Sequence, residues 1–150
     1  MTRYTWMLLL VLLVSACSQK EKGTEVVEET HPDGKPKKVA VYVDNAGKKQ
    51  KIQETLYYPN GQIEQDGKLN ENTLREGKWT YWYNDGKTWS EYEYQNGMRH
   101  GSCKVYFPNG QIRYAGQWEQ DQPVGNWKFW TNAGKLEREA NYAPTAAKKP

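Results

Sequence analysis

The sequence has little cysteine, little histidine and almost no excess charge. It contains two cysteines and two histidines in 150 residues, and its formal net charge is +3. So weak a basic bias argues against a nucleic-acid partner. Cysteine and histidine form no cluster with metal-ligand spacing and no glycine-rich phosphate loop is present, so we expect no metal site and no cofactor. A mean hydropathy of −1.02 leaves little apolar material for a thick core.

Long hydrophobic runs are also missing. The one strongly apolar stretch covers residues 6–14, behind Arg3. A membrane-spanning helix needs about 20 apolar residues, so this stretch is typical of a signal peptide instead. A plain secretory signal or a buried apolar segment are the alternatives.

The residues that follow this stretch are Val14, Ser15, Ala16 and Cys17. They resemble a bacterial lipobox, which implies cleavage between Ala16 and Cys17 and lipidation of Cys17. We therefore expect a signal helix over 1–16 and a flexible tether over 17–24. The resemblance also implies that Ser18 directs the protein to the outer membrane, so the predicted location is the cell envelope, on its periplasmic or surface side. Residues 19–22 are interpreted as part of a solvated tether, with a surface-export signal as the alternative.

What the sequence does contain is aromatic side chains and a repeat. Seven Trp and eleven Tyr favour β structure. Turn sequences ending in glycine recur at intervals of 27, 25, 24 and 24 residues. Asn-Gly and Asp-Gly pairs favour tight hairpin turns. The turns occupy residues 31–34, 58–61, 83–86, 107–110 and 131–134.

Alternation along the predicted strands divides the side chains between two faces. The more apolar set predicts a packed face formed by Trp79, Tyr81, Cys103, Val105, Trp127 and Phe129. The other face carries a second aromatic column beside two lysines. We predict a binding face there, composed of Tyr57, Trp82, Lys104, Tyr106, Lys128 and Trp130. The alternative is that this face is packed too.

The predicted fold is all-β: repeated antiparallel hairpins over 25–142 that form an elongated, twisted open sheet, followed by a disordered tail over 143–150. The segments 57–63 and 77–82, with Asp66-Gly67 and Asn96-Gly97, resemble the MORN-repeat variant of bacterial proteins. Many proteins of that kind are labelled antitoxins of the YwqK type. The resemblance implies a binding platform without a cofactor.

Candidate catalytic groups are few. His31 takes the place of Tyr58 in its repeat, and His100 is assigned to a turn. After lipidation of Cys17 only Cys103 remains, so no intramolecular disulfide can form, and we expect Cys103 to be a buried structural thiol. The acids Asp66, Glu91 and Glu139 share one repeat position. Pairing with lysines on neighbouring strands explains them better than catalysis does.

The leading hypothesis is a non-enzymatic, membrane-anchored lipoprotein whose repeats bind a protein or a cell-envelope glycan. An antitoxin or immunity protein that neutralises a toxin is one alternative, and an envelope polysaccharide-binding module is another. A glycan hydrolase is disfavoured because it needs two carboxyl groups across a cleft.

Overall fold

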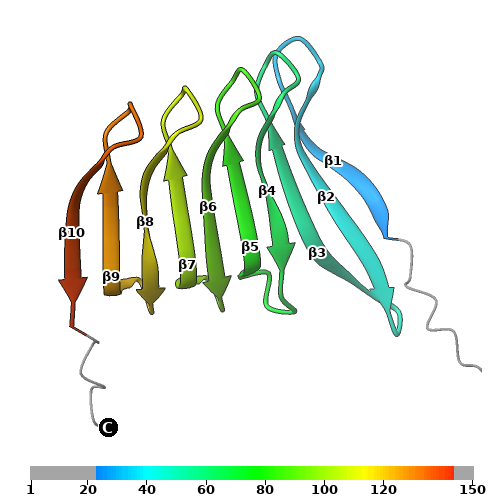
Figure 1. Ribbon diagram of the computed structural model, residues 1–150. Coiled ribbons are helices and arrows are strands. Elements are labelled where there is room, and N and C mark those ends of the chain that lie inside the picture. The colour runs from blue at the N-terminus through cyan, green and yellow to red at the C-terminus, as the bar shows by residue number, and fades with distance from the viewer. Residues whose placement is uncertain (1–22, 144–150) are drawn as a thin grey trace, which may run out of the picture.

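The protein, described by a computed structural model over residues 23–143, is one antiparallel sheet of ten strands in chain order (Figure 1). No helix occurs among these residues. The predicted all-β open sheet is therefore confirmed, whereas the predicted signal helix lies outside the described residues. The strands are β1 (Thr24–Thr30), β2 (Pro36–Asn45), β3 (Lys48–Tyr57), β4 (Ile63–Leu69), β5 (Arg75–Trp82), β6 (Thr88–Gln95), β7 (Met98–Tyr106), β8 (Ile112–Glu119), β9 (Gln122–Trp130) and β10 (Leu136–Tyr142).

Five similar turns form what we call the upper edge of the sheet, at the top of Figure 1. In each turn the glycine N–H donates to a carbonyl three residues earlier, as Gly61 does to Tyr58 at 2.9 Å. In the first three of these turns, the first residue also forms a hydrogen bond to the next hairpin. The hydroxyl groups of Tyr58 and Tyr83 donate to the carbonyls of Trp82 and Tyr106, both at 2.8 Å. The upper edge is thus cross-linked from one repeat to the next.

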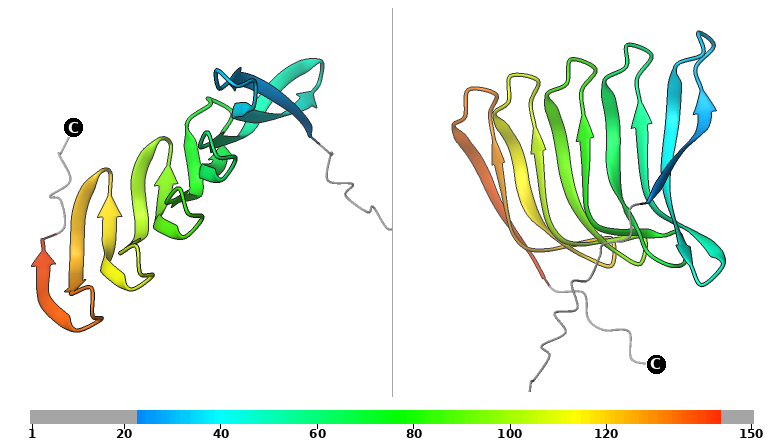
Figure 2. Two further views of the ribbon diagram at one scale, coloured as in Figure 1. Left: turned by 90° about the horizontal axis from the view of Figure 1, so that it is seen from above. Right: turned by 90° about the vertical axis from the view of Figure 1, so that its right-hand side faces the viewer.

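The lower edge, where β1 begins and β10 ends, has two-residue turns at 46–47, 96–97 and 120–121 and a five-residue turn at 70–74. Asn96 and Gly97 have φ values of 50° and 85°, which is the pair of positive angles that a type I′ hairpin turn requires. Ala46 and Gly47 adopt the same pair, 54° and 82°. These turns match the right-handed twist of antiparallel strands, and the sheet seen from above is strongly twisted (Figure 2).

A β-bulge follows each of the last four upper turns. Trp82 pairs with Thr88 and Tyr81 with Ser90, so that Trp89 is left as an extra residue. Glu64, Arg113 and Glu137 occupy the equivalent places. A bulge interrupts the alternation of side chains, and Trp89 accordingly lies against Tyr81, with ring centroids 6.2 Å apart.

The packed face, which we call the core face, is the one that the alternation predicted. The exposed fractions are 0% for Trp79, 2% for Cys103, 3% for Val105 and 5% for Trp127. Trp79 lies on Gly67 and Trp127 lies on Gly116, each on the preceding strand. The contact is so close that a Cβ added at either glycine would collide with the tryptophan ring. Within the described part of the chain, the two tryptophan rings are thus buried without a second sheet or helix layer, because each ring covers the backbone of the neighbouring strand.

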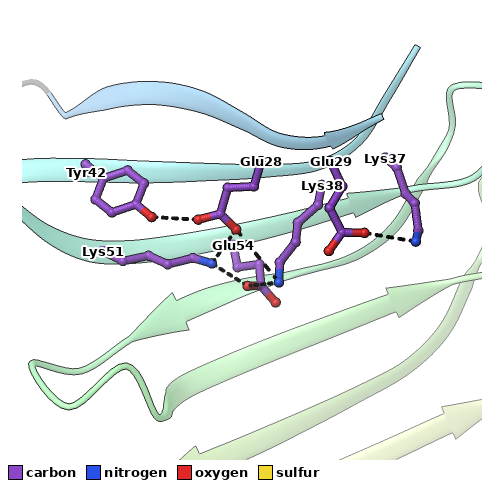
Figure 3. Close-up of polar contacts among 7 residues, drawn as sticks. All are labelled: Glu28, Glu29, Lys37, Lys38, Tyr42, Lys51 and Glu54. Atoms are coloured by element: carbon purple, nitrogen blue, oxygen red, sulfur yellow. Dashed lines mark hydrogen bonds and ion pairs between the residues drawn. The ribbon is translucent and has the colours of Figure 1, made fainter. Parts of the chain in front are cut away.

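At the amino-terminal end the core face is polar. Ala40 is fully buried there, but it pairs with Glu54, one of the charged residues drawn in Figure 3. Lys51 Nζ lies 2.8 Å from Glu28 and 2.6 Å from Glu54, and Lys38 lies 3.1 Å from Glu54. Tyr42 donates to Glu28 at 2.6 Å. We call Glu28, Lys38, Tyr42, Lys51 and Glu54 the ion cluster.

Candidate functional site

The predicted binding residues lie on the face opposite the core, which we call the strip face. Directly below the upper turns, the ladder ends in one side-chain pair per hairpin. Each pair joins an aromatic residue to a smaller one. The pairs are Tyr57 with Ile63, Trp82 with Thr88, Tyr106 with Ile112 and Trp130 with Leu136. We call these eight residues the strip.

The strip is partly open to solvent. Its four aromatic side chains are half-buried, whereas Ile63 and Leu136 are 37% and 45% exposed. Neighbouring strands are about 4.8 Å apart, so equivalent aromatic residues of successive hairpins are about 10 Å apart. Rings that contact each other have centroids about 4.5–7 Å apart. The four aromatic residues therefore form a row rather than a ring-on-ring stack.

A polar row runs beside the strip on the same face, two ladder positions further down each strand. Lys104 lies directly opposite Glu91 and Lys128 directly opposite Glu139. Glu91 also forms an ion pair with Lys78, and Lys128 Nζ lies 3.5 Å from Glu139. The predicted pairing of acids with lysines is thus confirmed for Glu91 and Glu139.

A hydrogen bond links the polar row to the strip at Tyr106. The hydroxyl of Tyr106 donates to Glu91 at 3.0 Å. The hydrogen bond from Lys78 is the main reason why the pKa of Glu91 is lowered. Burial and the hydrogen bond to Glu91 raise the pKa of Tyr106 to about 12, so its phenol remains a donor at neutral pH.

Asp66, the third acid of the set, accepts hydrogen bonds from Thr55 at 2.7 Å and from Gln53 at 2.9 Å. The three acids lie on β4, β6 and β10, in a row across an open sheet. Within residues 23–143 no three metal-ligating side chains come together.

A hollow of about 500 Å³ adjoins the strip at Tyr57. It is lined by apolar side chains of β1 and β2, chiefly Val27 and Val39, together with Glu25 and Lys35. The sequence did not indicate this hollow, because it depends on how β1 is placed beside β2.

Two of the candidate catalytic groups, Cys103 and His31, form contacts within the fold. Cys103 receives the indole N–H of Trp118 at 3.2 Å, and burial raises the pKa of its thiol. His31 Nε2 lies 2.9 Å from the carbonyl of Tyr57, the same link that Tyr58 makes in the next repeat. The assignment of His100 to a turn is wrong. His100 is an exposed residue of β7, because the tight turn falls earlier, at Asn96-Gly97.

Sequence reasoning found the aromatic half of the strip and the neighbouring lysines, and the structure brings them to one face. Sequence reasoning did not assign Ile63, Ile112 and Leu136 to the same surface. The signal was their place just after each upper turn, but the bulge at 64, 113 or 137 hides the pairing from simple alternation.

These features define a β-repeat protein with an open sheet. Each of the last four hairpins contributes one aromatic side chain to a single regular row. The MORN repeat variant family matches residues 51–71, 75–96 and 123–143, and the MORN repeat family matches residues 93–112 and 114–126. The chain belongs to the MORN-repeat proteins.

The other comparisons add little. No curated protein matches the chain. Among solved structures, the crystal structure of the GtfA/B complex bound to UDP and GlcNAc is similar over 70% of this chain, with 14% identity and a TM-score of 0.41. The matched part spans 22% of that chain. Over residues 23–143, no helix has the length and hydrophobicity needed to cross a membrane.

Proposed function

We propose that this MORN-repeat protein is a non-enzymatic, lipid-anchored protein of the cell envelope that binds a partner through the strip. The observation that carries the proposal is the row of four half-buried aromatic residues, repeated once per hairpin on the face opposite the core. Surfaces with regularly placed aromatic and aliphatic side chains are typical of contact sites.

The first strand begins at the edge of the sheet opposite the strip. β1 begins at the lower edge, only seven positions after Cys17. Seven residues reach at most about 25 Å even when fully extended. The strip lies at the upper edge, about 25 Å away along an eight-residue strand. A lipid on Cys17 would thus hold the start of β1 within about 25 Å of the membrane.

The anchor is tested by replacing the acceptor thiol. The Cys17→Ala protein should lose labelling by radioactive palmitate and should move from the membrane fraction to the soluble fraction. Cys103→Ala, which removes the other cysteine, should keep both the label and the membrane location. Labelling that depends on Cys103 would contradict the proposal.

Binding is tested by crosslinking the full-length protein in intact cells and recovering what it contacts. The Trp82→Ala/Trp130→Ala protein should lose the crosslinked partner. Trp89→Ala should keep it, because Trp89 is an exposed tryptophan that packs against Tyr81 on the core face. Recovery of a toxin would identify the immunity alternative. Equal recovery with both variants would refute a role for the strip.

A further inference from the structure

We infer that the strip binds a single, linear β-1,4-linked glycan chain that lies across the strands, with one disaccharide on each hairpin. This inference deepens the proposed function and rests on it. Four aromatic residues of the strip provide four equivalent contact positions for the glycan: Tyr57, Trp82, Tyr106 and Trp130.

The spacing of the aromatic residues favours a glycan over a peptide in the β conformation. Successive aromatic residues of the strip are two strand spacings apart, about 10 Å. An extended β-1,4-linked chain turns the same face of a sugar ring to one side once per disaccharide, and that repeat has nearly the same length. A polypeptide in the β conformation returns the same side every two residues, about 6.6 Å, and falls out of step with the strip after one hairpin. A glycan can therefore meet all four rings in the same way.

The twist of the sheet restricts the glycan further. Adjacent strands are rotated by roughly 20–25°, so successive aromatic residues turn relative to one another. A single chain follows this twist by rotation about its glycosidic bonds. A crystalline polysaccharide, whose chains lie in flat layers, does not.

The charge of the surface fits a neutral, hydroxyl-rich ligand. Two acids of the polar row form ion pairs with lysines, Glu91 with Lys78 and Glu139 with Lys128, and Lys104 lies opposite Glu91. Such a row carries little net charge, yet it offers carboxylate acceptors and ammonium donors along the whole strip. Sugar hydroxyl groups both donate and accept hydrogen bonds, so they complement both kinds of group.

The ends of the described chain do not obstruct the strip. β1 begins and β10 ends at the lower edge, whereas the strip lies directly below the upper turns. The hollow beside Tyr57 continues the strip past its first aromatic residue and gives room for one end of the chain. A long ligand can thus extend beyond both ends of the strip.

The test uses full-length protein in detergent micelles and β-1,4-linked N-acetylglucosamine oligomers of two, four, six and eight sugars, measured by calorimetry. Affinity should rise with each added disaccharide up to eight sugars. Maltooligosaccharides of equal length, which are α-1,4-linked and helical, should bind at least about tenfold more weakly. Crystalline chitin should not retain the protein.

Variants identify the surface. Trp82→Ala/Trp130→Ala should weaken binding of the eight-sugar oligomer by about tenfold or more, as loss of a contact hot spot does. Trp82→Tyr/Trp130→Tyr should retain most of the affinity, and Trp89→Ala should retain all of it. Far-UV circular dichroism verifies folding. If the double alanine protein is unfolded, Ile63→Lys/Leu136→Lys changes two exposed residues of the strip and should also weaken binding.

The inference is overturned if the oligomers do not bind, if affinity is independent of length, or if a folded strip variant binds as the unchanged protein does. If crosslinking to an envelope protein still depends on Trp82 and Trp130 while glycans fail to bind, the proposed function stands and the glycan is excluded. If neither experiment depends on these residues, both proposals fail.

Discussion

The two ends of the core face solve the same packing problem with different chemistry. From β5 to β10 the face is aromatic, and Trp79 and Trp127 are buried by lying on glycines of the preceding strand. From β1 to β3 the same face carries the ion cluster (Figure 3), and the buried Ala40 pairs with Glu54 of that cluster. The strand order and the antiparallel pairing are nevertheless the same throughout.

This difference shows which features of the repeat are fixed and which are interchangeable. The backbone is specified by the turns and by the ladder of hydrogen bonds, while the covering of the core face varies from repeat to repeat. The two coverings should differ in their response to pH, because aromatic packing carries no titratable group in the acid range and the ion cluster does.

The largest expected effect is in the aromatic half. Trp79→Ala should lower the free energy of unfolding by about 3–5 kcal/mol, since it empties a fully buried site. It also removes the contact with Arg75, whose guanidinium carbon lies 4.4 Å from the ring centroid. Urea unfolding gives the value. Tyr42→Ala in the ion cluster should cost less, because Tyr42 is only half-buried. Equal costs would mean that the two halves do not differ in packing.

A second change tests how large and small residues are matched within the aromatic half. Cys103 occupies a tryptophan position, and its partner Tyr92 occupies the place that Gly67 and Gly116 hold in other repeats. Cys103→Trp should cost about 1–3 kcal/mol, because the ring meets Tyr92 instead of a glycine.

Tyr92→Gly/Cys103→Trp should recover a large part of that loss, because it restores the tryptophan-on-glycine pair. A double-mutant cycle by thermal unfolding measures the coupling between the two sites. Additive effects would contradict the explanation.

Acid should loosen the amino-terminal half first. Hydrogen bonds from Lys51 and Tyr42 lower the pKa of Glu28. Burial alone raises the pKa of Glu54, but hydrogen bonds from Lys51 and Lys38 outweigh it, so this pKa is lowered too. Their stabilisation is complete above the unfolded-state values, near 4.5, and is lost as the pH falls through the lowered folded values.

We expect a loss of about 1–2 kcal/mol from the ion cluster on acidification. Hydrogen exchange should show it as faster exchange in β1 and β2, with β8 and β9 unchanged. Glu28→Gln/Glu54→Gln should remove most of this pH dependence. An equal loss of protection across all ten strands would show that the sheet unfolds as one unit.

The smallest effect concerns the upper edge, which both halves share. Tyr58→Phe removes the hydrogen bond to the carbonyl of Trp82 and should cost about 1 kcal/mol. Phe107 occupies the same turn position without a hydroxyl, so Phe107→Tyr should gain a smaller amount. Thermal unfolding of both variants measures the difference. A gain from Tyr58→Phe would show that the link between turns is not stabilising.

The sequence alone determined the repeat, the turns and the two faces of the regular strands. These features follow from local rules: glycine and asparagine tolerate positive φ at turns, and side chains alternate along a strand. The burial of Trp79, Cys103, Val105 and Trp127 was predictable for that reason. The binding role of the strip and the lipidation of Cys17 stay predictions.

Only the tertiary structure decided what the bulges do. Lys51 and Glu54 are three residues apart, which places them on opposite faces of a regular strand. A bulge at Ile52 brings Lys51 to the core face, opposite Tyr42, where it meets Glu54 and Glu28. An extra residue shifts the phase of every side chain beyond it, and only the pairing with the neighbouring strand shows where that residue falls. Local patterns determined the hairpins, and pairing between strands determined which side chains share a surface.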